Sequence, residues 1–386
     1  MANHTGVLLE MKNITKEFPG VRALDGVSFT LKKGSVHALM GENGAGKSTL
    51  MKCLFGIYSV DSGEIYLDGD RVSFKSPNDA LQNGVAMVHQ ELNQATKRNV
   101  MDNIWLGRYP TRLGFITSER EMYDKTKAIF DDLGIKTDPR SIMSTMSVAE
   151  RQMAEIAKAV SYDARVIVLD EPTSSLSDRE VEHLFAIIDK LKGRGCGIIY
   201  ISHKMDEILR ISDEITVMRD GKHIATEPSE NMTMNRIIKL MVGRELTEMY
   251  PKKTNSPGEV ILRVEGLSSR HNHVNDVSFN LRRGEIIGFA GLAGAGRTEV
   301  IENLFGISER ESGKIFLDGK EIKNRDPREA IKNGFALITE ERRATGIFGI
   351  LDICENTTVS GLKKYLRFGL LSDRLRKEDT DWAIKS

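Results

Sequence analysis

The chain has 386 residues, of which 40% are hydrophobic and 28% are charged, and its 55 Lys and Arg residues balance its 55 Asp and Glu residues. This composition excludes a largely disordered chain and argues against a strongly basic nucleic-acid-binding protein. The three cysteines form no C-x-x-C pair, so we expect neither a disulfide framework nor a structural zinc site, and the count favours a reducing compartment.

Apolar runs are short throughout the sequence. None approaches the roughly 20 residues that span a bilayer, and residues 1–6 do not resemble the start of a secretory signal. We therefore expect a cytoplasmic chain, which leaves open that it docks onto a membrane protein.

The first chemical motif lies at residues 41–49, which read GENGAGKST and match G-x-x-x-x-G-K-[ST]. The apolar run 36–40 predicts a strand before this loop, and residues 47–55 predict a helix after it. Such a loop turns its backbone N–H groups toward one anion, and the helix N-terminus adds partial positive charge. Lys47 is expected to reach the β- and γ-phosphates, and the Ser48 hydroxyl to bind Mg²⁺. The predicted nucleotide-binding residues here are Gly41, Glu42, Asn43, Gly44, Ala45, Gly46, Lys47, Ser48 and Thr49.

An acidic pair follows the apolar run 166–169. A continuous apolar run of this length is typical of a parallel strand that is buried on both faces, and ligands bind at the carboxyl ends of such strands. We predict that Asp170 holds Mg²⁺ through water and that Glu171 is the general base that polarises the attacking water. Taken alone, such a pair could instead be solvated or cap a helix.

Two more polar residues follow apolar runs. His203 comes after the run 198–201, where it is predicted to reach a γ-phosphate and orient the water, although a lone histidine there is usually structural. Gln90 comes after the run 85–88 and is predicted to sense both the metal and the attacking water. All these residues are therefore expected at one edge of a single sheet.

The chain also repeats itself with a spacing of 250 residues. Residues 26–91 and 276–341 align without a gap and share 25 identities in 66 positions. We predict two copies of one α/β domain, residues 7–244 and 259–386, joined by a polar connector at 245–258. The second copy is expected to be incomplete, because the counterpart of Asp170 would lie near position 420.

The loop at 41–49, Gln90, the run VIVLDEPTSSL at 166–176 and SHK at 202–204 stand in one order. In these motifs the chain resembles the ATP-binding subunits of ABC transporters, over essentially its whole length. The resemblance implies a P-loop NTPase fold, with ATP and Mg²⁺ as cofactors. It also implies an aromatic residue that stacks on adenine, which Phe18 matches; the alternative is that Phe18 is a core residue.

The tandem arrangement and TEERRATGI at 339–347 narrow the resemblance to the monosaccharide importer type. Within that type, LMKCLFGIY at 50–58, MVHQELN at 87–93 and MDNIWLGRYP at 101–110 most resemble importers of galactose or a methyl galactoside. The resemblance implies ATP hydrolysis that drives uptake, and no contact with nucleic acid. It implies permease subunits as partners, a sugar-binding protein acting indirectly, pairing with a second copy, and a peripheral position on the cytoplasmic face of the inner membrane. Trp105 and Tyr109 are candidates for the permease contact, unless they pack inside the domain.

The resemblance implies a signature LSGGQ, which completes the phosphate site of the partner domain. Residues 146–150 read MSVAE instead. Ser147 and Glu150 predict a capping box, which is the alternative role for this serine. Val148 and Ala149 replace both glycines, and their side chains are expected to hinder the approach of phosphate.

The second phosphate loop, GLAGAGRT at 291–298, is also altered. Arg297 replaces the lysine, Glu340 stands where Gln90 stands in the first copy, and the counterpart of Phe18 is missing. We expect the first copy to bind Mg-ATP and the isolated chain to hydrolyse it poorly.

Three other readings remain. A tandem ATPase acting on ribosomes would carry a longer connector and intact signatures. A DNA-repair ATPase would need a coiled coil where only about 100 residues separate Lys47 from Ser147. A non-catalytic regulatory remnant would bind ATP without turnover. The pair His271 and His273 lies in a polar loop, which makes a metal site there a poor expectation.

Overall fold

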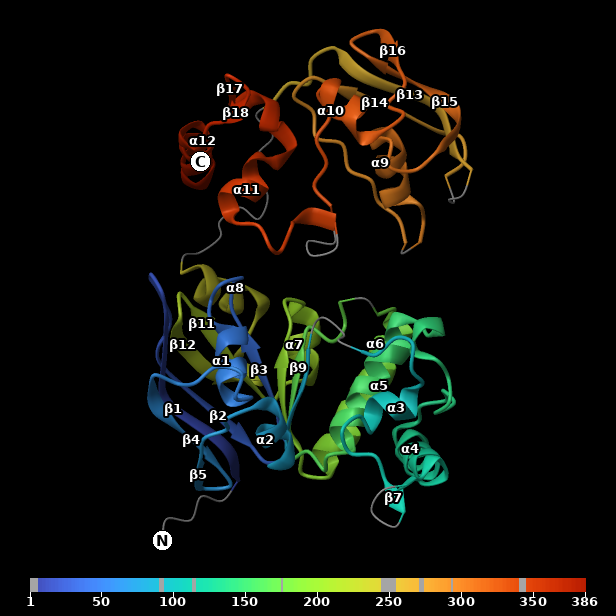
Figure 1. Cartoon of the computed structure of the whole chain (residues 1–386). Helices are drawn as coiled ribbons and strands as arrows, with labels where there is room; N and C mark the ends of the chain where they lie inside the picture. The colour runs from blue at the N-terminus through green and yellow to red at the C-terminus, as the bar shows by residue number, and fades with distance from the viewer. Residues whose placement is uncertain are drawn as a thin grey trace. The chain divides into compact units, whose positions relative to one another are not determined.

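The computed structural model describes residues 6–89, 94–112, 116–174, 176–243, 255–270, 274–292, 294–339 and 345–386 (Figure 1). The chain divides into two compact units, Met1–Met249 and Tyr250–Ser386. The connector predicted at 245–258 falls mostly outside the described residues, so its bounds stay a prediction. No helix in the described ranges is long and apolar enough to cross a membrane.

Unit 1 contains an antiparallel sheet with the strand order β2-β1-β4-β5. These strands are β1 (Val7–Phe18), β2 (Val21–Lys32), β4 (Ser62–Leu67) and β5 (Asp70–Val72). Buried and exposed side chains tend to alternate along β2, as expected for a strand with one face on a core. Two residues separate β1 from β2, so the strands form a hairpin in which Phe18 pairs with Val21.

A second sheet in unit 1 has the order β12-β11-β3-β10-β9-β6, in which only β12 is antiparallel to its neighbour. Its strands are β3 (Val36–Met40), β6 (Val85–Val88), β9 (Val166–Asp170), β10 (Gly197–Ile201), β11 (Glu214–Arg219) and β12 (Lys222–Pro228). The four runs that predicted buried parallel strands are therefore β3, β6, β9 and β10. Their carboxyl ends bring the predicted site residues to one edge.

The helices of unit 1 are α1 (Lys47–Leu54), α2 (Pro77–Gln82), α3 (Val100–Ile104), α4 (Glu119–Leu133), α5 (Val148–Val160), α6 (Asp178–Gly193), α7 (Met205–Ile211) and α8 (Met234–Val242). Two 3-10 turns, η1 (Met143–Thr145) and η2 (Ser229–Asn231), and a short hairpin, β7 (Thr111–Arg112) with β8 (Ile116–Thr117), complete it.

Two cores lie on opposite faces of the parallel sheet, and β10 shows the alternation. Ile198 and Tyr200 pack into the core that includes α5 and α6. Ile199 and Ile201 pack into the core that includes α1 and the antiparallel sheet. Both faces are covered, which is the physical reason for unbroken apolar runs.

Unit 2 repeats the antiparallel sheet in the same order, β14-β13-β15-β16. Its elements are β13 (Val260–Ser269), β14 (Val277–Arg282), β15 (Arg310–Leu317), β16 (Lys320–Ile322), α9 (Arg297–Phe305), α10 (Pro327–Lys332), α11 (Ile353–Thr358), η4 (Val359–Tyr365), β17 (Leu366–Arg367), β18 (Leu370–Leu371) and α12 (Asp373–Lys385).

The parallel sheet does not recur in the described part of unit 2. Residues 286–290, which align with β3, are not a strand, and Ile286 is 95% exposed. In unit 1, β3 lies between β10 and β11. Within the described part of unit 2, residues 286–290 have no such neighbouring strands with which to pair.

Candidate active site

The phosphate loop connects β3 to α1 and depends on two glycines. Gly41 has φ 155°, and a Cβ there would collide with the carbonyl oxygen of Met218. Gly46, the N-cap of α1, has φ 99°, and its Cβ would lie 2.8 Å from the carbonyl oxygen of Ala23. A residue with a Cβ atom would be strained and would clash at both positions. This explains the first and third glycines of the motif.

Lys47 begins α1 and folds back over the loop. Its Nζ donates to the carbonyl oxygens of Gly41 at 2.7 Å and Glu42 at 3.0 Å. Burial lowers the pKa of Lys47, while the nearby carboxylates of Asp170 and Glu171 act in the opposite direction. The ammonium thus lies between the loop and the acidic pair, as a phosphate ligand requires.

A cavity of about 420 Å³ opens beside the loop. It brings together nine of the predicted residues: Asn43, Gly44, Ala45, Gly46, Lys47, Ser48, Thr49, Asp170 and Glu171. Residues from two distant parts of unit 1 therefore line one volume.

Sequence reasoning missed another part of the lining, which comes from β2 and from the turn between β11 and β12. Residues 21–23, Asp220 and Gly221 line the same cavity. The turn is held to the loop, because Gly221 N donates to Ala45 O at 3.2 Å. An Asp-Gly pair between two strands predicts a tight hairpin, but nothing in the sequence places that hairpin beside the phosphate loop.

Asp170 ends β9, and its carboxylate is largely buried. Burial raises the pKa of Asp170, with Glu171 adding to the shift and Lys47 opposing it. Within the described ranges the carboxylate has no hydrogen bond or ion pair. A buried carboxylate together with the Ser48 hydroxyl in one cavity is an oxygen donor set that Mg²⁺ accepts, so the residues fit this metal.

Glu171 and His203 lie together at the ends of neighbouring strands. The Nδ1 of His203 is 3.2 Å from Oε1 of Glu171, and Glu171 N donates to Ile201 O at 2.8 Å. The histidine side chain is 68% exposed and that of Glu171 only 21%. The imidazole is thus the more solvent-exposed member of the pair.

Four predictions are not tested. Phe18 packs edge-to-face on Tyr58 with ring centroids 5.2 Å apart and is not part of the cavity lining. Gln90, Glu340 and the pair His271 and His273 lie outside the described residues. Their predicted roles remain predictions.

Trp105 packs inside the helical part of unit 1. Its Nε1 donates to Thr126 Oγ1 at 2.9 Å, and the ring lies against the core. Trp105 is therefore better described as a residue that packs inside the domain than as a permease contact. Tyr109 is 36% exposed and stays a candidate.

The segment in place of the signature begins α5, with the predicted capping box between Ser147 and Glu150 present. The steric expectation was wrong for one residue. Val148 is 46% exposed, but Ala149 is only 7% exposed and faces the domain. Ala149 lies on the inner side of the first turn, so only Val148 presents a side chain to an approaching phosphate.

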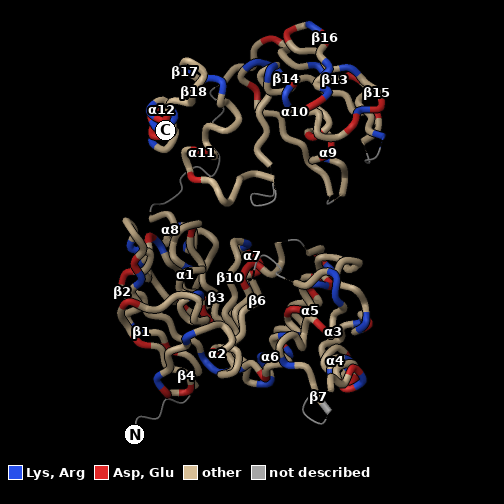
Figure 2. Tube along the Cα trace, in the orientation of Figure 1, with Lys and Arg blue, Asp and Glu red and all other residues tan. Residues whose placement is uncertain are grey.

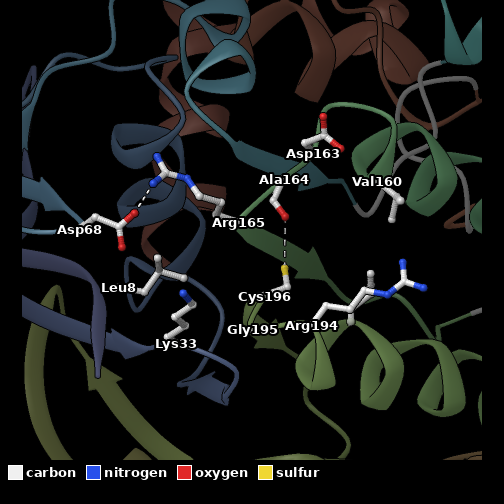
Figure 3. A pocket seen from close by; sticks show the side chains of 11 residues that line it. Leu8, Lys33, Asp68, Val160, Asp163, Ala164, Arg165, Arg194, Gly195 and Cys196 are labelled. Atoms are coloured by element: carbon white, nitrogen blue, oxygen red, sulfur yellow. Dashed lines mark hydrogen bonds and ion pairs between the residues drawn. The ribbon is translucent and has the colours of Figure 1, made fainter. Parts of the chain in front are cut away.

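A second cavity, of about 350 Å³, lies at the amino ends of β9 and β10 (Figure 3). Its arginines already have partners: Arg165 pairs with Asp68, and Arg194 pairs with Asp132. The buried Cys196 thiol donates to Ala164 O at 3.5 Å, and burial raises its pKa to about 12. None of the predicted site residues lines this second cavity.

A phosphate loop, an acidic pair and a histidine at the carboxyl edge of one parallel sheet define the class of P-loop nucleotide-binding domains. The family model described as ABC transporter matches residues 24–174 and 274–383. The chain belongs to this family, and the two matched segments confirm the predicted tandem copies.

The galactose/methyl galactoside import ATP-binding protein of Clostridium perfringens strain SM101 is 60% identical over 98% of this chain and 74% of that protein. A protein of the same description from Photobacterium profundum is 58% identical over 99% of this chain and 76% of its own length. The predicted family resemblance is confirmed.

Two solved structures are similar to this chain. One, an ATP-binding cassette of an ABC transporter in its ADP conformation, has TM-score 0.55 and 26% identity over 62% of this chain and its own full length. The other, a nucleotide-free cassette, has TM-score 0.54 and 27% identity over 61% of this chain and 95% of its own length.

Proposed function

We propose that this chain is the ATP-binding, energy-coupling subunit of an importer for galactose or methyl galactosides. The observation that carries the proposal is the one cavity that the phosphate loop with Lys47 and the acidic pair Asp170 and Glu171 line together. The identity of the sugar is inferred from the names of the relatives. No residue of the described cavity selects it, and we assign that choice to the permease and the sugar-binding protein.

The geometry supports hydrolysis of the γ-phosphate. The loop amides and the Lys47 ammonium stabilise negative charge on the phosphates. Ser48 and Asp170 would hold Mg²⁺, which neutralises charge on the phosphate oxygens when bound. Glu171 accepts a proton from water as that water attacks, and His203 holds the glutamate and water in line. Phe18, beside the cavity-lining Val21 in the β1–β2 hairpin, is proposed to meet the adenine.

The useful result of hydrolysis is a change in how two nucleotide-binding domains are held together. ATP held between two such domains favours their closed state, and loss of the γ-phosphate releases it. We propose that this cycle moves permease subunits in the inner membrane, with the chain bound peripherally on their cytoplasmic side and paired with a second copy. Residues around Tyr109 are proposed to contact the permease.

Nucleic acid is not proposed as a partner. Figure 2 shows Lys and Arg interspersed with Asp and Glu along the described parts of both units, and the equal numbers of basic and acidic residues in the chain give no support to binding of a phosphate backbone.

The test of this function is ATP binding by the full chain. Lys47→Ala should weaken the Mg²⁺-dependent affinity for ATP about 30-fold or more in titration calorimetry, because it removes a charged ligand of the phosphates. Lys33→Ala is the matched control, since Lys33 lines the second cavity and not the site. Wild-type chain without Mg²⁺-dependent affinity, or equal affinity in Lys47→Ala, would refute the proposal.

The same scheme predicts slow turnover by the isolated chain. The intact phosphate loop belongs to unit 1, and the domain that should complete it has no parallel sheet in the described part of unit 2. Steady-state hydrolysis of several ATP molecules per second by the chain alone would contradict this expectation.

A further inference from the structure

Glu207, in the first turn of α7, gathers three donors onto one carboxylate. Its Oε2 accepts hydrogen bonds from Thr173 Oγ1 at 2.7 Å and from Tyr200 OH at 3.0 Å. Its Oε1 lies 3.0 Å from the Nζ of Lys204. No motif in the sequence singles out this glutamate, and it lines none of the cavities described above.

The donors come from two segments that meet only in the folded unit, namely the loop after β9 and the stretch from β10 to the start of α7. Thr173 lies in the loop after β9, Tyr200 lies in β10, and Lys204 is the N-cap of α7. Lys204 Nζ also donates to the carbonyl oxygen of Thr173 at 3.0 Å, which joins the two loops directly.

Most of this network is shielded from water, although the Lys204 side chain is 39% exposed. Thr173 is 1% exposed, Tyr200 is fully buried, and the Glu207 side chain is 13% exposed. Burial raises the pKa of the Tyr200 phenol, so it remains protonated and donates. Hydrogen bonds to a shielded carboxylate are stronger and more rigid than those on the surface.

The two loops that Glu207 joins carry the catalytic pair. Thr173 is two residues after Glu171, and Lys204 directly follows His203. The contact between Glu171 and His203, 3.2 Å long, includes a histidine that is 68% exposed. An exposed side chain has little packing of its own to keep it there, so the loops beneath must set its position.

We propose that Glu207 is a positioning residue that fixes the distance between Glu171 and His203 by holding the loop after β9 to the loop before α7. This proposal rests on the proposed ATPase function for its kinetic consequences. Its structural consequence, the placement of His203, does not depend on ATP.

An amide cannot replace this carboxylate. Glutamine keeps one acceptor oxygen and presents an NH₂ group where the second oxygen accepted. In Glu207→Gln the NH₂ group would either oppose the Lys204 ammonium, which only donates, or donate to the hydroxyl oxygens of Thr173 and Tyr200, whose own protons would then lose their acceptor. Asp206→Asn makes the same chemical change one residue away, on an exposed side chain, and is the matched control.

The kinetic test compares the wild type with both variants in the assembled transporter, where turnover is expected to be measurable. Glu207→Gln should lower kcat for ATP hydrolysis about tenfold to 100-fold, because small misplacements of reacting groups cost this much. Its KM and its affinity for Mg-ATP should stay within about twofold of the wild type, because the phosphate loop is untouched. Asp206→Asn should match the wild type in all three values. Unchanged kcat in Glu207→Gln would overturn the proposal.

A second readout is independent of ATP. In spectra of chain labelled at histidine, the imidazole signal of His203, identified by its loss in His203→Gln, should shift in Glu207→Gln and not in Asp206→Asn. Should the chain fail to bind ATP, the proposed function falls while this signal still decides the positioning role. An unmoved signal overturns that role.

If Glu207→Gln does not fold, Thr173 provides the equivalent test. Thr173→Val keeps the shape of the side chain and removes the hydroxyl donor, whereas Thr173→Ser retains it. We expect the His203 signal and kcat to change in the valine variant and to be restored in the serine variant. Identical behaviour of the two variants would overturn the proposal.

Discussion

Glu171 has a left-handed backbone with φ 49°, although it is not a glycine. Such a conformation costs of order 1–3 kcal/mol and persists only where the surroundings impose it. Two contacts hold this residue in place: Glu171 N donates to Ile201 O, and the side chain contacts His203. The unusual backbone lies at the residue to which we assign proton transfer.

Replacing this glutamate should separate binding from chemistry. Glu171→Gln removes the proton acceptor but keeps the shape, so turnover should fall at least about 100-fold, the contribution typical of a general base. Its affinity for Mg-ATP should be retained, because Lys47 and the loop are intact. Measuring both in the assembled transporter checks the role, with the exposed Asp178→Asn as control. Wild-type turnover in Glu171→Gln would remove Glu171 from the mechanism.

At the scale of single elements, β3 carries a buried histidine. His37 Nε2 lies 2.7 Å from Thr216 Oγ1, while its Nδ1 is buried without a hydrogen-bond partner in the described part of the chain. Burial lowers the pKa of His37 to about 4, although the charge of Glu214 opposes the shift. The strand therefore holds this imidazole neutral.

This burial predicts an acid-sensitive stability. With the folded pKa at about 4 and the unfolded value at 6.5, both states are neutral above pH 7. As the pH falls from 7 to 5, only the unfolded chain takes up a proton at this position. Unfolding thus becomes easier by about 2 kcal/mol through this residue. Denaturant titrations at pH 7 and pH 5 should show this loss reduced in His37→Gln but not in His183→Gln. Equal losses in all three chains would contradict it.

The sequence predicts features that depend on neighbouring residues better than features that depend on contacts between segments far apart in the chain. The strands at 36–40 and 166–169 and the cap at Ser147 follow from local patterns, and the structure has them. The burial of Ala149 and the place of Gly221 beside the loop depend on the packing of distant segments, which periodicity does not encode. Glu207 was missed for the same reason.

For the whole molecule, the two units differ in how fully they cover their apolar residues. The four-stranded sheet and α9 of unit 2 enclose a small core that includes Val264, Leu267 and Ile315. Beyond that core, Leu292 and Ile338 are 85% and 97% exposed. In unit 1 the aligned run containing Val88 is a buried strand.

We expect residues 1–249 to fold and to bind Mg-ATP as the full chain does, because every described residue of the site belongs to unit 1. Residues 250–386 alone should self-associate through their exposed apolar side chains. Titration calorimetry of the first fragment and light scattering of the second would check this. Loss of ATP affinity in residues 1–249, or a monodisperse second fragment, would contradict it.

The three thiols differ in accessibility, so the rates at which they are labelled can report on the conformation of the chain. Cys53 and Cys196 are buried in unit 1, where burial raises their pKa values to about 11 and about 12, while Cys354 in unit 2 is half-buried. A maleimide dye at neutral pH should thus attach first at Cys354, because inaccessible protonated thiols react slowly. Uptake of further dye would then time the opening of the nucleotide-binding unit, without any engineered label.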